Sequence, residues 1–226
     1  MRALLLVAVI SLAACASNGN MSPSQLAKGD IDRVVEADHR AVFASLKVLA
    51  EKLYRRNPRE WHKAGLASEE AALARLFDPS KAWRLPELGG RYGVEAVLAG
   101  LRDDYGGDRV AAFIGGLGGM LHDAFNDKTE FYFFDDLDPQ KLHNAARNLE
   151  IAAWELANAR AADGGPLLLS NEMQPWQNLS FEREFGKMIG NLDLLSEIIA
   201  DKTNRSITKV IQGMASAVFL PVAGLK

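Results

Sequence analysis

The sequence predicts an all-α protein with a single globular helical domain. Apolar residues recur at spacings of three and four along most of the chain after residue 29, which places them on one face of successive helices. Only the segment 129–135 has the aromatic composition of a strand, and we expect at most one short strand or hairpin there. The chain contains no internal repeat of the kind that would indicate a solenoid. Together these observations predict six to eight helices around one core.

The first two long helices are predicted between residues 30 and 77. The apolar positions of the first helix share one face and are Ile31, Val35, Val42, Leu46, Leu49 and Leu53. A short turn follows, in which Asn57 is suited to capping and Pro58 to the first helical position. The next helix is expected to start at Ser68, whose side chain can cap it, and to end before Pro79.

The middle of the chain contains a loop and three further helices. Residues 78–93 hold two prolines and three glycines and are expected to form the loop. A short helix is predicted from Val94 to near Asp103, and a second helix over residues 109–125. Because Asp138 precedes Pro139, as a cap precedes the first helical residue, a third helix is predicted from there to about residue 161.

The last part of the chain begins with a long connection, residues 163–178, that contains apolar anchors. A helix is predicted next, with apolar residues in regular 4,3 spacing at Phe181, Phe185, Met188, Leu192, Leu195 and Ile199. The same spacing recurs at Ile207, Ile211, Met214 and Val218. It predicts one more helical run, which Pro221 ends.

Four glycines, Gly115, Gly116, Gly118 and Gly119, lie inside the helical segment 109–125. Each costs about 0.8–1 kcal/mol relative to alanine in a helix, so something must offset them. They permit either close packing against another element or a break that lines a ligand pocket. Membrane insertion and phosphate binding are disfavoured, because the apolar run is too short to span and no phosphate-loop pattern surrounds it.

The first 14 residues have the layout of a secretory signal. Arg2 supplies a positive charge, an apolar run follows from Ala3 to Ile10, and small residues lead up to the only cysteine, Cys15. The apolar stretch is shorter than the roughly 20 residues that a transmembrane helix needs. A cleaved signal is therefore expected rather than a membrane-spanning helix.

Leu12-Ala13-Ala14-Cys15 resembles the lipobox of bacterial lipoproteins. The resemblance implies that a peptidase cuts between Ala14 and Cys15 and that Cys15 becomes acylated. Two or three acyl chains would anchor the protein firmly in the lipid bilayer. Ala16 and Ser17 follow the cysteine with no aspartate, which resembles lipoproteins sorted to the outer membrane.

The expected organisation has three parts. Residues 1–14 are the signal, residues 15–29 are a lipidated, flexible tether rich in serine, asparagine and glycine, and residues 30–226 are a helical domain facing the periplasm. Without Cys15 the domain has no cysteine, so its core alone must hold it together. The formal net charge of −3 argues against a general nucleic-acid binder.

The polar candidates do not form a legible catalytic or metal-binding pattern. The histidines lack metal-ligand spacing and are His39, His62, His122 and His143. Two histidines have an aspartate beside them, which makes Asp38–His39 and His122–Asp123 either buried polar contacts or parts of a site. No cofactor is predicted.

Two other polar segments are weaker candidates for sites. Asp135, Asp136 and Asp138 lack the ligand number and glycine that a calcium loop needs, so no metal site is predicted, and Asp138 is better explained as a helix cap. Ser170 and Glu172 have no base and no orienting group placed by the sequence, so no catalytic residue is predicted.

The aromatic residues Phe131, Tyr132, Phe133 and Phe134 are a candidate surface for a partner or a ligand, with burial in the core as the alternative. The function expected is that of an envelope interaction or assembly protein, anchored through Cys15 and bound to an envelope protein. A small-ligand or lipid binder is the first alternative. An enzyme is the second, and it would require His122 or His39 to meet an acid such as Asp135 or Glu172 in a cleft.

Overall fold

A computed structural model describes residues 28–132, 135–210, 213 and 216–223, to which the structural statements below refer. Seven α-helices lie in these residues: α3 (Asp30–Arg56), α4 (Pro58–Lys63), α5 (Glu69–Leu76), α6 (Val94–Gly100), α7 (Arg109–Ala124), α8 (Pro139–Asn158) and α9 (Ser180–Thr203). Two 3₁₀ turns, η1 (Pro79–Lys81) and η2 (Pro86–Leu88), interrupt the loop between α5 and α6. The described part contains isolated β-bridges and no strand, which confirms the predicted all-α class and helix number. None of its helices is both long and apolar enough to cross a membrane.

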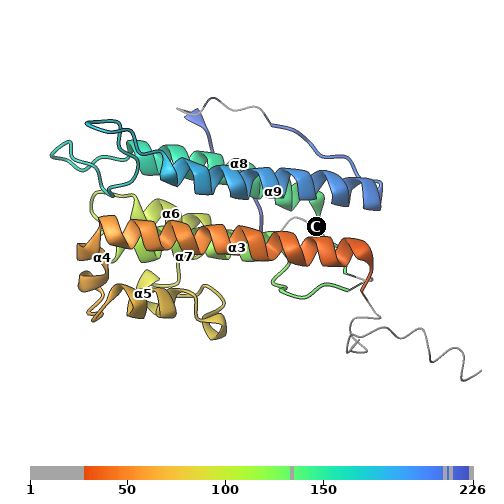
Figure 1. Ribbon diagram of the computed structural model, residues 1–226, viewed down its shortest axis with the longest axis horizontal. Coiled ribbons are helices and arrows are strands. Elements are labelled where there is room, and N and C mark those ends of the chain that lie inside the picture. The colour runs from red at the N-terminus through yellow and green to blue at the C-terminus, as the bar shows by residue number, and fades with distance from the viewer. Residues whose placement is uncertain (1–27, 133–134, 211–212, 214–215, 224–226) are drawn as a thin grey trace, which may run out of the picture.

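The helices form layers that run along the long axis of the molecule (Figure 1). Helices α8 and α9 pack against each other in one layer, and α3, α6 and α7 form the next. Helix α5 and the loop that follows it cover the far side of α7. The start of α3 lies at one end of the molecule, whereas α4 and the connection between α8 and α9 lie at the opposite end.

Helix α3 forms because its apolar residues line one face, as its spacing predicts. Five of these side chains are almost fully buried in the core: Val35, Val42, Leu46, Leu49 and Leu53. Each contributes about 1.5–3 kcal/mol through removal of apolar surface from water. At its start, the Asp32 carboxylate accepts a hydrogen bond of 2.8 Å from the Gly29 N–H, which satisfies a backbone donor outside the helix.

The predicted starts of α5 and α8 are confirmed by their caps. Ser68 Oγ accepts a 3.2 Å hydrogen bond from the Ala71 N–H at the start of α5. Asp138 Oδ1 accepts one of 2.9 Å from the Gln140 N–H at the start of α8, beside Pro139. These bonds replace the intrahelical partners that the first N–H groups of a helix lack.

The helix predicted from Ile207 to Val218 is wrong for the described residues of that segment, which have no α-helix. Helix α9 ends where Asn204 adopts a left-handed conformation with φ of 52°. Beyond it, side-chain amides of α8 bind the backbone of this C-terminal segment. Their hydrogen bonds supply the partners that a helical backbone would have found within itself.

Three amides spaced by four residues along α8 make these contacts. Asn148 acts in both directions, because its Oδ1 accepts from the Leu220 N–H at 2.6 Å and its Nδ2 donates to the Leu220 carbonyl at 2.8 Å. Asn144 Nδ2 donates to the Pro221 carbonyl at 2.7 Å. Gln140 Oε1 accepts from the N–H of Thr208 at 2.8 Å. The C-terminal segment is therefore held along α8 through its main chain.

The glycines of α7 are sites of close packing. A Cβ atom at Gly116 would lie 2.6 Å from the carbonyl oxygen of Gly93 and from the N atom of Val97, at the start of α6. At Gly118 a Cβ would lie 2.1 Å from the ring of Trp83, and at Gly119 it would lie 2.7 Å from the ring of another aromatic residue of the same loop. These positions cannot hold a larger residue unless their neighbours move.

The remaining glycine of this helix follows the same rule, because a Cβ at Gly115 would lie 2.9 Å from Leu85 Cδ1. Trp83, which covers Gly118, is itself in the left-handed region with φ of 63°. Its ring stacks at 5.6 Å on Phe43 and meets Phe77 edge-on at 5.2 Å. A left-handed Trp is strained, so these ring contacts and the fit onto α7 must compensate for it.

We predict that Gly116→Ala destabilises the protein by about 2 kcal/mol or more, although alanine favours a helix by about 1 kcal/mol over glycine. The reason is the backbone of α6, which cannot yield as a flexible side chain could. Gly190→Ala in α9 is the matched control, because nothing lies within 4 Å of the position that a Cβ would take there. That variant should be more stable by up to about 1 kcal/mol. Chemical denaturation of both variants tests this, and a stabilised Gly116→Ala would contradict it.

Candidate functional site

The structure places His39 in an aromatic cluster rather than in an open site. Its ring lies 4.4 Å from the ring of Phe43, 4.9 Å from that of Phe125 and 6.4 Å from that of Phe131. The residue is 9% exposed. Burial, followed by the charge of nearby His122, lowers the pKa of His39 to about 4. At neutral pH it therefore packs as an uncharged ring.

Asp38 is half-buried, and its Oδ2 is buried with no hydrogen-bond partner in the described part of the chain. Burial raises the pKa of this carboxyl to about 6. No hydrogen bond joins Asp38 to His39 within the described residues. The two neighbours in sequence are thus separate features of the structure.

No ion pair or hydrogen bond joins His39 or His122 to Asp135 or Glu172 in the described structure. His122 Nε2 lies 3.6 Å from Asp127. Asp135 forms an ion pair with Lys128. Glu172 lies 3.1 Å from a guanidinium nitrogen of Arg56, at the other end of the molecule.

Asp123, the neighbour of His122, binds a tyrosine instead of a histidine. The single hydroxyl proton of Tyr92 is shared between two acceptors, the Gly119 carbonyl and Asp123 Oδ1, each 3.0 Å from the hydroxyl oxygen. Burial raises the pKa of the Asp123 carboxyl and, more strongly, that of the Tyr92 hydroxyl. This contact ties the loop before α6 to the end of α7, which is a structural role.

Asp38 gives a prediction for pH dependence. Since its folded pKa of about 6 lies above the ordinary value of 3.8, its ionisation lowers the free energy of unfolding as pH rises through this interval. Asp38→Asn should therefore stabilise the protein at pH 7, by about 1–2 kcal/mol after allowance for partial exposure, with the difference vanishing below pH 4. Denaturation at several pH values measures this. The control is Glu51→Gln on the same helix, and equal pH profiles for Asp38→Asn and the parent would refute the prediction.

The aromatic segment proposed as a partner or ligand surface is corrected in part. Phe131 is 1% exposed and packs 6.2 Å from the ring of Phe125, so it belongs to the core. Tyr132 is half-buried, and its hydroxyl donates to Glu130 at 2.7 Å. Phe133 and Phe134 lie outside the described residues. The pattern of large apolar residues is the same for a core segment and an exposed patch, which is why spacing did not distinguish them.

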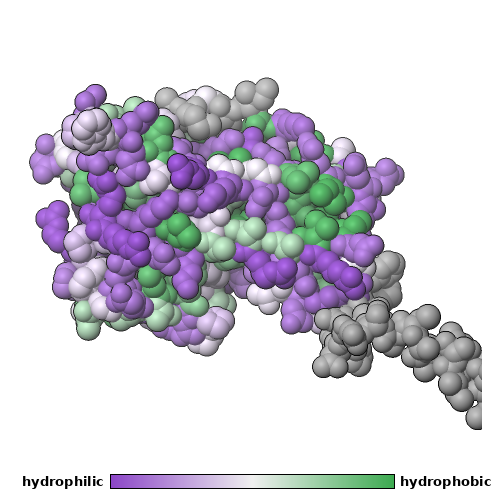
Figure 2. Space-filling view, in the orientation of Figure 1, coloured by the Kyte–Doolittle hydropathy of each residue, from purple (hydrophilic) through white to green (hydrophobic). Residues whose placement is uncertain are grey.

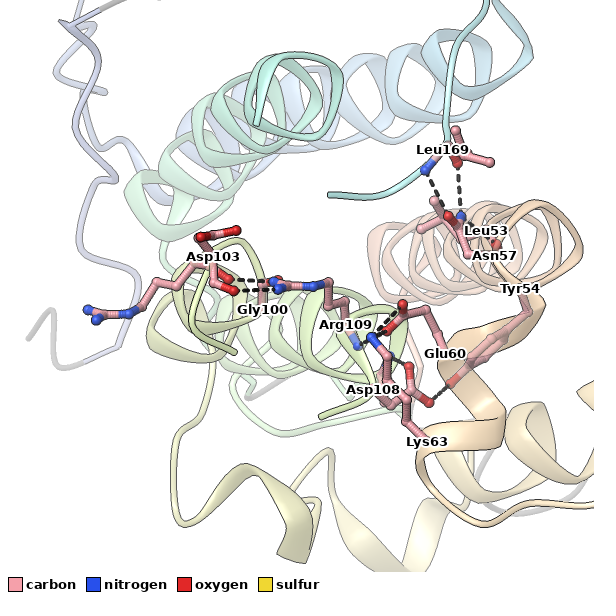
Figure 3. Close-up of polar contacts among 12 residues, drawn as sticks. Leu53, Tyr54, Asn57, Glu60, Lys63, Gly100, Asp103, Asp108, Arg109 and Leu169 are labelled. Atoms are coloured by element: carbon pink, nitrogen blue, oxygen red, sulfur yellow. Dashed lines mark hydrogen bonds and ion pairs between the residues drawn. The ribbon is translucent and has the colours of Figure 1, made fainter. Parts of the chain in front are cut away.

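The end of the molecule that carries α4 holds a buried polar network (Figure 3). Tyr54 donates to Asp108 Oδ2 at 2.9 Å, and Asp108 Oδ1 caps α7 by accepting from the Ala111 N–H at 2.9 Å. Glu60 accepts from the Arg109 N–H at 2.8 Å and lies 2.7 Å from Lys63 Nζ. Two carboxylates thus share the N-terminus of α7, where backbone N–H groups favour negative charge.

Arg109 extends this network to the C-terminal end of α6. Its guanidinium donates to the carbonyls of Gly100 at 2.8 Å and Asp103 at 3.0 Å, and so closes the C-terminal end of α6 (Figure 3). The pKa of the Asp108 carboxyl is raised, and burial is the main cause. These buried groups find their partners at helix ends, and they hold α4, α6 and α7 in fixed positions.

A groove of about 550 Å³ opens beside the network. Arg56, Arg59 and Lys63 contribute to its lining, together with Leu167 and Leu169 from the connection between α8 and α9. Asn57 fixes this connection onto the end of α3. Its Oδ1 accepts from the Leu169 N–H at 2.7 Å, and its Nδ2 donates to the Leu169 carbonyl at 2.9 Å (Figure 3).

Next to the groove, residues 173–177 form the tip of a short hairpin. Glu172 and Asn178 close it with two backbone hydrogen bonds, of 3.1 and 2.7 Å. Side chains hold its base, since Glu172 pairs with Arg56 and Asn171 donates to Glu182 at 2.7 Å. The tip is thus presented on an anchored base.

This hairpin and its flanks expose four large apolar side chains, which we call the distal apolar surface: Leu169, Met173, Trp176 and Leu179. Trp176 is 83% exposed and Met173 is 61% exposed. The sequence predicts a connection with apolar anchors for this stretch and predicts no site in it. One feature of the sequence does indicate an exposed apolar residue here. It is the tryptophan in the polar run Gln174-Pro175-Trp176-Gln177, where no core position is expected.

Within the described residues, no group of three or more histidines, cysteines, aspartates or glutamates is placed to hold a metal ion. No family model matches the sequence, and neither a curated protein nor a solved structure matches it.

Proposed function

We propose that this protein is a lipid-anchored envelope lipoprotein whose helical domain binds another envelope protein. The lipobox at Leu12–Cys15 supports the anchor, although these residues lie outside the described structure. The distal apolar surface carries the proposal for the domain. It exposes an indole and a thioether that folding does not bury.

Its chemistry suits a protein partner. Tryptophan is enriched among the residues that dominate binding energy, and methionine adapts its shape to a facing pocket. Polar groups lie at the base of the apolar tip, where Glu172 pairs with Arg56 and Asn171 binds Glu182. An apolar centre within a polar rim is the usual anatomy of a protein interface. Because the base is already anchored, little conformational freedom is lost when the tip binds.

The position of the surface also fits an anchored protein. The tether joins the domain at the start of α3, and the distal apolar surface lies at the opposite end of the molecule (Figure 1). Helix α3 has 27 residues, which corresponds to about 40 Å at 1.5 Å per residue. The domain can therefore place the hairpin tens of ångströms from its membrane attachment, where an envelope partner is accessible.

A small apolar ligand is the alternative. A pocket of about 370 Å³ lies between the start of α6, α7 and the C-terminal segment. Its lining includes Tyr92, Met120, Phe219 and Val222. Tyr92 also covers Gly119, so this pocket adjoins the glycine helix.

For the anchor, we predict that Cys15→Ser leaves an unacylated precursor with its signal uncut. The physical reason is that acylation needs the thiolate and that the peptidase acts on the acylated form. Electrophoretic mobility and labelling with a radioactive fatty acid measure the outcome. Normal processing of the variant would refute the lipobox assignment. It would not contradict the proposal for the helical domain.

For the domain, we predict that Trp176→Ala combined with Met173→Ser removes a specific partner from a cross-linking pull-down of the lipoprotein in its own membranes. Loss of two anchor residues should weaken binding at least about 30-fold, or roughly 2 kcal/mol. Leu98→Ser is the matched control, because Leu98 is an exposed apolar residue of α6 that does not line the groove beside the hairpin. A partner retained by the hairpin variant, or lost equally in both variants, would contradict the proposal.

A further inference from the structure

Helix α3 has a second apolar face that the fold does not use. Its exposed residues on this face are spaced 3, 4, 3 and 4 apart, and we call them the outer seam: Val34, Ala37, Ala41, Ala44 and Val48. A surface helix needs one apolar face for the core, and α3 already has that face, turned towards α7 and α9. The outer seam is thus additional to what folding requires.

The seam is part of a larger apolar area. On the neighbouring helix α9, Leu194 is 62% exposed. Figure 2 shows that an apolar band runs along α3 and continues into a group of apolar residues over α9, with hydrophilic residues along the edge of the band. The area is elongated along the helix axis. From Val34 to Val48 it extends about 20 Å at the rise of an α-helix, the length of two heptads.

One edge of the seam is basic. Arg33, Arg40 and Lys47 recur every seven residues, each directly before a seam residue, and all three are exposed. In the portion of the chain that the structure describes, no ion pair or side-chain hydrogen bond joins these three cations to another residue. The charge of Arg40 acts on nearby Glu36, whose own ion-pair partner is Lys28. In a helical interface, positions at this spacing flank the seam and pair with charges on the partner helix.

We propose that the outer seam of α3 docks an amphipathic helix of a partner protein, and that this helix carries acidic residues beside its apolar seam. The 3,4 spacing matches the packing of one helix on another, and the small alanine side chains permit close approach. The basic edge selects acidic flanks, because opposite charges across an interface steer association and exclude partners of like charge.

The same charges argue against a second copy of this chain that pairs antiparallel with the first through the seam. If two α3 helices paired antiparallel through their seams, the edge with Arg40 would face the equivalent edge of the other copy, and like charges would meet. The proposal extends the function proposed above to a surface separate from the distal apolar surface. Either surface can therefore fail its test while the other stands.

The test uses the intact lipoprotein in nanodiscs of zwitterionic lipid, with empty nanodiscs as the blank. Two fluorescent helical peptides of about 21 residues share an apolar heptad seam and differ only at the flanking positions, which are glutamate in one and lysine in the other. Fluorescence anisotropy measures binding. We expect the acidic peptide to bind at least about tenfold more tightly than the basic peptide, a difference of about 1.4 kcal/mol.

Variants locate the binding. Ala41→Glu should weaken binding of the acidic peptide at least about tenfold, because it puts a like charge into the seam. Ala74→Glu, the same change at an exposed alanine of α5, should leave it unchanged. Arg40→Glu combined with Lys47→Glu should reverse the preference in favour of the basic peptide. This double variant changes only exposed side chains, so its folding is expected to be preserved, and circular dichroism checks it.

Three results would overturn the proposal. The first is equal binding of the two peptides, or binding of neither. The second is an affinity for the acidic peptide that stays unchanged in both Ala41→Glu and the charge-reversed variant. The third comes from Ala41→Cys, which adds the only cysteine to the domain. Efficient disulfide linkage between copies of this variant in the membrane would assign the seam to a second copy of the chain.

Discussion

The direct contact between the backbone of α7 and the residues that cover it is the constraint on which the rest of the fold depends. Because residue 116 is glycine, the start of α6 comes within van der Waals distance of the α7 backbone, and the rings of Trp83 and Tyr92 pack against the next turn. The cost of four glycines in a helix, about 3–4 kcal/mol, is offset by this contact, which buries α7 from Arg109 to Leu121. The remaining layers pack around α7, whose position these close contacts fix.

Side chains that bind backbone groups complete the two ends of this arrangement. At the end with α4, Asp108 and Glu60 bind the first N–H groups of α7, and Arg109 binds the last carbonyls of α6. Along α8, Asn148 and its neighbouring amides bind the C-terminal segment. Apart from the half-buried Gln140, these polar groups are buried, and each has a hydrogen-bond partner, so they stabilise a single arrangement of helices.

Local signals made much of the fold predictable, and long-range contacts explain what was not. Ser68 and Asp138 predicted helix starts because capping depends on neighbours in sequence. The segment from Ile207 to Val218 had the spacing of a helix, but its backbone partners come from α8, which no local pattern reports. The exposure of Trp176 and the burial of Phe131 are likewise tertiary properties. Spacing revealed the core face of α3, whereas its second apolar face became apparent only once the structure located its neighbours.

The way in which α8 holds the C-terminal segment has an evolutionary consequence. Asn148 recognises the N–H and C=O of Leu220, groups that almost every amino acid possesses, and it does not read the side chain. Mutations at Leu220 or Pro221 should therefore accumulate with little selection, apart from proline at 220, which would remove the donor. Asn148, fully enclosed by its surroundings, should by contrast resist replacement even by aspartate, which cannot donate. Related chains would then share the amides of α8 while the segment that they bind diverges.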